Sequence, residues 1–154
     1  MNTHETYVNL ETAKLLKEAG FDWEVEFFYQ DGVLKSVLPD VLFNDNFEDI
    51  EYYYKHIGIP LSSINYNDGS SKFLEEYSAP NLSITQRWLR EVMDTYIIPQ
   101  ISDYEANGCI WEYDYRVGIH NINPIRSLYK YKSYEEALEA GIQKCLNIIL
   151  NKTK

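Results

Sequence analysis

Cysteine is scarce in this chain of 154 residues, in which only Cys109 and Cys145 occur. Neither has another cysteine or a histidine at the short spacing that compact metal sites need. The three histidines, His4, His56 and His120, also lack a second ligand two to four residues away. We therefore predict two buried thiols in a reducing compartment, with no metal and no cofactor.

Basic residues are also few: 14 Lys and Arg stand against 24 Asp and Glu, which gives a net charge of −10. The field of such a chain repels a phosphate backbone, so nucleic-acid binding is an unlikely main activity. The acidic residues are scattered and form no tail, which is typical of a solvated acidic surface.

Long apolar runs are missing as well. No stretch approaches the roughly 20 residues that span a bilayer, and the first residues lack the basic and apolar regions of a signal peptide. The sequence also contains no G-x-S-x-G, no P-loop and no G-x-G-x-x-G. We expect neither membrane insertion nor secretion, and no motif points to an enzyme.

Three amphipathic helices are predicted. The first covers residues 10–19, with Asn9 as its N-cap and Gly20 as its stop. The second follows Pro80 and contains QRWLREV, with Ser83 and Gln86 as a capping box; Ser133 and Glu136 form another before the terminal helix YEEALEAGIQKCL. Gly141 inside that last helix indicates close packing against an aromatic sheet face.

Strands are predicted from alternation of apolar and polar residues. They cover residues 21–29, 33–37 after the turn signal Asp31-Gly32, 97–101 on a sheet edge because of Pro99, 109–117, and 126–131. Residues 40–80 are predicted to form a variable insertion with a short helix at 46–57. The hairpins and the absence of βαβ alternation favour an α+β fold, with a mostly antiparallel sheet and helices packed on one face, as a single domain over 1–154.

The segments YVNLETAKLLKEAGFD, QRWLREV and SYEEALEAGIQKCL, in this order, resemble a family of short uncharacterised proteins carried by phages and prophages of gut bacteria. The resemblance covers about half of the chain. It implies a phage origin and a location in the cytoplasm of the bacterial host cell. It implies no activity and no catalytic residue.

Aromatic residues are abundant, with 14 Tyr, and three arginines stand out in an acidic chain. The simpler interpretation is that Arg87, Arg90 and Arg116 form surface salt bridges of little energy with Glu91, Glu112 and Asp114. If the helix after Pro80 lies beside the 109–117 strand, these arginines would instead converge near Tyr113 and Tyr115, where guanidinium groups and rings suit a small anionic ligand such as a nucleotide.

Two catalytic interpretations involve residues of the predicted 109–117 strand. Glu112 and Asp114 share one strand face and would make either a carboxylate pair or two ordinary solvated charges. Cys109 could approach His120, although its inward position predicts a buried and inert thiol.

Three functions follow, in decreasing order of support. The first is a non-enzymatic phage accessory protein that binds a protein, either a host defence or regulatory factor or a second copy of itself. The second is a binder of a small anionic ligand, and the third is a hydrolase or transferase whose site is assembled from loops.

Overall fold

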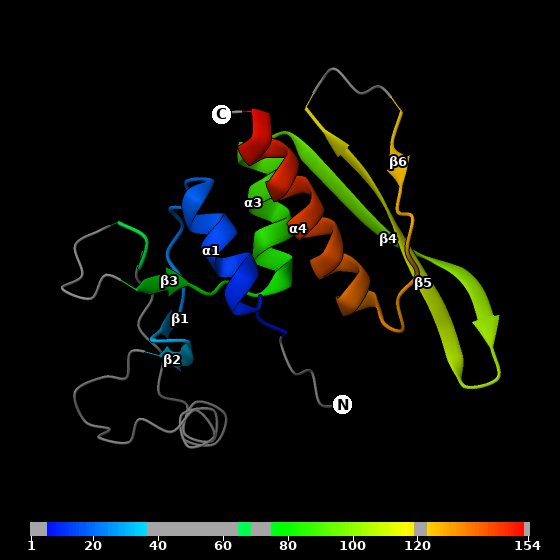
Figure 1. The fold of residues 1–154 in the computed structure, drawn as a ribbon, viewed down its shortest axis with the longest axis horizontal. Helices are drawn as coiled ribbons and strands as arrows, with labels where there is room; N and C mark the ends of the chain where they lie inside the picture. The colour runs from blue at the N-terminus through cyan, green and yellow to red at the C-terminus, as the bar shows by residue number, and fades with distance from the viewer. Residues whose placement is uncertain (1–5, 37–64, 69–74, 119–122, 153–154) are drawn as a thin grey trace. The chain divides into compact units, whose positions relative to one another are not determined.

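A computed structural model of the chain describes residues 6–36, 65–68, 75–118 and 123–152. The fold is α+β, as predicted, with helices packed against antiparallel strands (Figure 1). Within the described ranges, the strands form two sheets of three strands each, in the orders β2-β1-β3 and β4-β5-β6, where the sequence predicted one sheet. No helix in the described ranges is both long and apolar enough to cross a membrane.

The chain divides into two compact units. The terminal unit combines residues 1–8 with 81–154, and the inserted unit spans residues 9–80. The chain enters and leaves the inserted unit beside one antiparallel bridge, because Tyr7 pairs with Asn81. That the chain behaves as a single domain stays a prediction.

In the inserted unit, helix α1 (Leu10–Glu18) begins at the predicted residue and ends one residue before the end of the predicted range 10–19. The Asn9 side chain accepts a hydrogen bond from the Thr12 amide at 2.9 Å, and Gly20 adopts a φ of +89° just after the helix. Its buried residues are Thr12, Ala13 and Leu16, which lie on one face. Helix α1 packs against β3.

The sheet of this unit is built on the turn Asp31-Gly32. Both residues have positive φ, +52° and +77°, as a tight hairpin turn requires. Strands β1 (Phe27–Gln30) and β2 (Val33–Ser36) pair antiparallel across it. Strand β1 is shorter than the predicted 21–29, and its other edge pairs with β3 (Glu76–Ser78), which the sequence did not predict.

The end of the predicted 40–80 insertion therefore belongs to a sheet. Residues 37–64 and 69–74, which include the predicted helix at 46–57, lie outside the described residues. Tyr66 stacks on Phe28 at 4.1 Å between ring centroids, so residues of this stretch also contribute to the core of the unit.

In the terminal unit, helix α3 (Leu82–Val92) begins two residues earlier than its predicted cap allows. Asn81 is the N-cap: its side-chain oxygen accepts from the Ile84 amide at 2.8 Å. The predicted capping box of Ser83 and Gln86 was wrong, because Ser83 lies inside the first turn. Gln86 instead donates to the Ile97 carbonyl at 2.7 Å, on the neighbouring strand.

The second sheet is dominated by a long hairpin. Strands β4 (Thr95–Glu105) and β5 (Gly108–Val117) pair antiparallel, with a bulge between Ile101 and Asp103. Strand β6 (Ile125–Arg126) pairs with β5, and a further bridge joins Trp111 to Tyr131, close to the predicted 126–131 strand. The sheet order places β4 on an edge, as Pro99 predicted.

Helix α4 (Tyr134–Lys152) starts at the predicted serine cap, because the Glu136 amide donates to Ser133 Oγ at 3.1 Å. The Glu136 carboxylate accepts from the Lys132 amide at 3.0 Å. In a usual capping box it would accept from the amide of the cap residue itself, here Ser133. Gly141 packs on the sheet: a Cβ added there would lie 2.6 Å from Ile97 Cγ2 and 3.1 Å from the Tyr113 ring. The predicted reason for this glycine is confirmed.

Candidate functional site

The structure does not bring the five predicted ligand-binding residues together. Tyr113 and Tyr115 point toward the helices and are buried, 5% and 8% exposed. Burial, together with the neighbouring Tyr131, raises the pKa of Tyr113, so its phenol stays protonated at physiological pH. Both tyrosines are part of the core rather than of an accessible ligand surface.

Arg116 directly follows Tyr115 in β5, and its side chain points to the opposite face of the sheet because side chains alternate along a strand. Its guanidinium lies over the Tyr96 ring at 4.5 Å and approaches Asp94 at 3.8 Å. On α3, Arg87 pairs with Glu91 at 2.8 Å as an exposed i,i+4 ion pair, and Arg90 is exposed. Ligand binding by these residues stays a prediction.

The two carboxylates of β5 hold a different arginine from those predicted. Arg126 Nε lies 3.0 Å from Asp114 Oδ1 and 3.2 Å from Glu112 Oε1. Gln100 Nε2 donates to both carboxylates, at 3.2 and 3.3 Å. Asp114 and then Glu112 raise the pKa of Arg126, which therefore stays charged. One guanidinium thus balances one of the two carboxylate charges, and the Gln100 amide bridges both carboxylates.

Metal and nucleophile chemistry find no support in the part of the chain that the structure describes. No three His, Cys, Asp or Glu side chains gather there in a metal-binding group. All three histidines lie outside the described residues, and so does the predicted approach of His120 to Cys109. Cys109 is half-buried rather than buried, a correction to the prediction, because it lies near the hairpin turn.

The two thiols should differ in reactivity. Cys145 is fully buried, and burial raises its pKa to about 12, whereas Cys109 is half-buried. At pH 8 a pKa rise from 9 to about 12 lowers the thiolate fraction roughly a thousandfold. We expect a colorimetric thiol reagent to titrate one thiol in the native protein and two in denaturant. The Cys109→Ser variant should lose the fast reaction, and the Cys145→Ser variant should react as fast as the wild type. Fast labelling of Cys145 in the native protein would contradict this expectation.

The same shift predicts a loss of stability in alkali. An unfolded thiol ionises near pH 9 and the folded one near 12. Burial of the protonated Cys145 thiol therefore contributes fully to the free energy of unfolding below pH 9, and this contribution is lost as the pH rises toward 12.

Exposed apolar side chains concentrate on the β4-β5-β6 sheet and the segment after it. The large apolar side chains exposed on the sheet and the following segment are Tyr96, Ile98, Ile101, Tyr104, Ile125, Leu128 and Tyr129. In the rest of the described residues, the exposed large apolar side chains are Val33, Val92 and Tyr134. Solvent contact of so many apolar groups in one part of the terminal unit suggests an interaction surface.

The edge of β4 is blocked against the addition of another strand. Trp111 exchanges backbone hydrogen bonds with Tyr131, and the Tyr113 carbonyl accepts one from the Ser127 amide. The β4 partners of Trp111 and Tyr113 therefore direct their backbone groups to the outer edge. At that edge the Gln86 side chain already donates a hydrogen bond to the Ile97 carbonyl, and Pro99 has no N–H to donate to another strand. The bulge follows, and the Asp103 carboxylate accepts from the Tyr104 amide at 2.8 Å. A partner would therefore contact side chains rather than extend the sheet.

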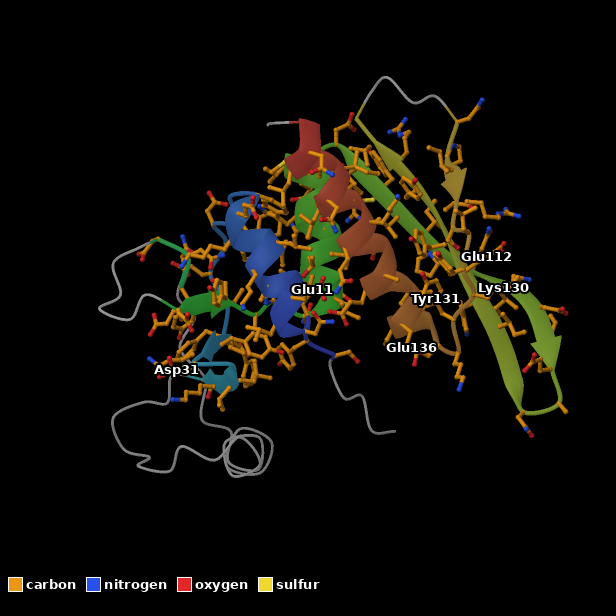
Figure 2. The ribbon with its side chains drawn as sticks, viewed as in Figure 1. Glu11, Asp31, Glu112, Lys130, Tyr131 and Glu136 are labelled. Atoms are coloured by element: carbon orange, nitrogen blue, oxygen red, sulfur yellow. The ribbon has the colours of Figure 1, made fainter. Side chains whose placement is uncertain are left out.

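The most exposed large apolar side chain among the described residues, Leu128, lies on the 128–130 loop, which leaves the sheet opposite Glu112 (Figure 2). Leu128 is 93% exposed and Tyr129 is 72% exposed. Hydrogen bonds fix both ends of the loop. Ser127 Oγ accepts from the Tyr113 amide at 3.2 Å and donates to the Tyr129 carbonyl at 3.0 Å, and Tyr131 exchanges two 2.8 Å backbone bonds with Trp111. The Leu128 and Tyr129 side chains therefore extend into solvent from a loop that is hydrogen-bonded at both ends.

Sequence reasoning missed this loop, although a signal for it exists. Residues 115–134 contain no Asp or Glu and carry Arg116, Arg126, Lys130 and Lys132, in a chain of net charge −10. Among the described residues, Arg116 and Arg126 have acidic partners, while the exposed Lys130 and Lys132 have no ion pair. The loop therefore combines exposed apolar side chains with two lysines, beside the carboxylates of Glu112 and Glu136.

Comparisons with known proteins add no assignment. No protein-family model matches the chain, and no curated protein or solved structure matches it.

Proposed function

We propose that this protein acts by binding another protein, without catalysis. One observation carries the proposal. The terminal unit exposes apolar side chains on its sheet and on the 128–130 loop, where Leu128 and Tyr129 lie between hydrogen-bonded ends. Burial of such groups drives protein association, and a loop that is already ordered loses little entropy on binding. Tyrosine is also among the residues enriched at binding hot spots.

The resemblance of the capped helices to phage and prophage proteins supports a context for this activity. In that context the chain is an accessory protein in the cytoplasm of a bacterial host. Its partner there is a host defence or regulatory factor or a second copy of the chain.

The binding of a small anionic ligand has weaker support. Arg87 and Arg116 already lie beside carboxylates, and Tyr113 and Tyr115 are buried. A thermal-shift screen of the full chain against nucleotides tests this alternative, and a shift that Arg116→Gln removes would favour it.

The experiment for protein binding compares three forms of the full chain. These are the wild type, Leu128→Glu/Tyr129→Glu, and Val92→Glu, which changes an exposed apolar residue of α3 and serves as the matched control. Each is used to capture proteins from the lysate of a gut bacterium, and captured proteins are then purified and titrated calorimetrically.

We expect the wild type and the Val92→Glu variant to bind the same purified protein, and the loop variant to bind it at least about tenfold more weakly. Unchanged melting temperatures would show that all three forms fold. Equal binding by all three forms, or no binding to any protein including the chain itself, would rule out the proposal.

A further inference from the structure

The end of the β4–β5 hairpin carries the only Asn-Gly step of the sequence, Asn107-Gly108. Strand β4 ends at Glu105 and β5 begins at Gly108, so Asn107 lies in the turn between them. Every residue from 103 to 108 is exposed. The turn therefore places an asparagine side chain beside a glycine backbone nitrogen, in contact with water.

An asparagine that precedes a glycine can lose its side-chain amide without an enzyme. The backbone nitrogen of the next residue attacks the asparagine Cγ, the new C–N bond closes a succinimide ring, and the side-chain nitrogen leaves as ammonia. Water then opens the ring at either carbonyl, which gives aspartate or isoaspartate. A Cβ on the following residue hinders the approach of its nitrogen, and glycine has none.

The structure leaves this approach open at Gly108. A Cβ built there would meet no atom within 4 Å, and the φ of +144° is one that other residues rarely adopt. Glu105 and Gly108 are the last pair of the β4–β5 ladder, so opening of this single pair frees the Gly108 amide while the rest of the hairpin stays paired. The attacking nitrogen is thus available in the folded protein.

The Asn107 side chain has no hydrogen bond within the described residues, whereas several other asparagines are held in place. The side-chain oxygens of Asn9, Asn67 and Asn81 each accept a backbone amide at 2.8 to 3.0 Å, and Asn147 donates to a backbone carbonyl at 2.9 Å. Each of these four is also followed by a residue with a side chain. Both conditions for ring closure, a free amide and an unhindered nitrogen, are met at Asn107.

We propose that Asn107 is a site of spontaneous deamidation in the folded protein, with aspartate and isoaspartate at the hairpin end as its products. The new carboxylate would join those of Asp103 and Glu105, which are also exposed there. Isoaspartate would in addition insert a methylene group into the backbone of the turn. This reactivity needs no binding partner, since water is the only other reactant.

Ageing of the full chain under native conditions tests the proposal. The wild type is compared with Asn107→Gln, whose longer side chain closes a ring much more slowly, and with Asn147→Gln, the same change at an exposed asparagine of α4. Peptide mapping by mass spectrometry locates the deamidated residue, and an isoaspartyl methyltransferase with S-adenosylmethionine measures the isoaspartate. Circular dichroism shows that each form stays folded, and the wild type unfolded in guanidinium chloride serves as the reference.

We expect deamidation of the wild type and of Asn147→Gln to concentrate at residue 107, and Asn107→Gln to form little isoaspartate. The rate at residue 107 should rise with pH, because the attacking amide nitrogen must lose its proton.

An Asn107 that stays intact in the native protein would overturn the proposal. If the unfolded chain then deamidates at this residue, protection by the paired hairpin is the reason. Equal isoaspartate in the wild type and in Asn107→Gln would overturn the proposal as well, because another residue would be its source.

Discussion

Replacing Trp88 with alanine is expected to lower the free energy of unfolding by about 3–5 kcal/mol. Trp88 is fully buried in α3, which packs against β4 and α4, so the substitution leaves a large cavity. Urea unfolding followed by circular dichroism measures the change. Val92→Ala in the same helix is the control, since Val92 is 52% exposed and its loss should cost at most about 0.5 kcal/mol. Equal stabilities of the two variants would contradict the packing described.

Gly141→Leu should lower the free energy of unfolding by a similar amount, about 3 kcal/mol or more, because α4 lies directly on the sheet at this position. The space for even one added carbon is missing, as the distance of 2.6 Å to Ile97 Cγ2 shows. Gly141→Ala is the milder form. Its steric cost of about 1–3 kcal/mol opposes a gain of about 1 kcal/mol in helix propensity.

A double-mutant cycle separates these two effects on stability. Ile97→Ala removes the methyl group that the new Cβ would meet. In that background Gly141→Ala should cost less than in the wild type, or stabilise the protein, while Lys144→Ala, at an exposed position of α4, should show no such dependence. Additive effects of Gly141→Ala and Ile97→Ala would mean that the two residues do not touch.

The secondary structure could largely be predicted because local signals determine it. Asn9, Asp31-Gly32 and Ser133 act through hydrogen bonds and dihedral angles within a few residues, and each lies where it was predicted to act. The cap of α3 was misplaced because Asn81 and Ser83 are both good N-caps, and sequence spacing alone does not decide between them. Strand β3 and the division into two sheets depend on contacts across more than 40 residues, which no local pattern records.

The candidate site was predictable only in part. Alternation along 109–117 already places Arg116 on the face opposite Tyr113 and Tyr115, so their convergence conflicted with the predicted strand. The exposure of Leu128 and Tyr129 depends on the loop that residues 128–130 form between two points of pairing with β5, which a propensity argument does not detect. The acid-free run over residues 115–134 was the one signal of this surface in the sequence.

Residues of the QRWLREV segment and of the 128–130 loop should therefore behave in opposite ways. Trp88 and Leu89 are buried, so their substitution should reduce stability. Leu128 and Tyr129 are exposed, so their substitution should leave stability within about 0.5 kcal/mol and change binding.

Site-specific photocrosslinking at Tyr129 tests the binding surface most directly. A benzophenone amino acid is placed at position 129, or at Val92 as the control, and the full chain is irradiated in bacterial cells. We expect a discrete covalent adduct to a protein, either a second copy or another chain, from position 129 and none from position 92. No adduct from position 129, or the same adducts from both positions, would contradict it.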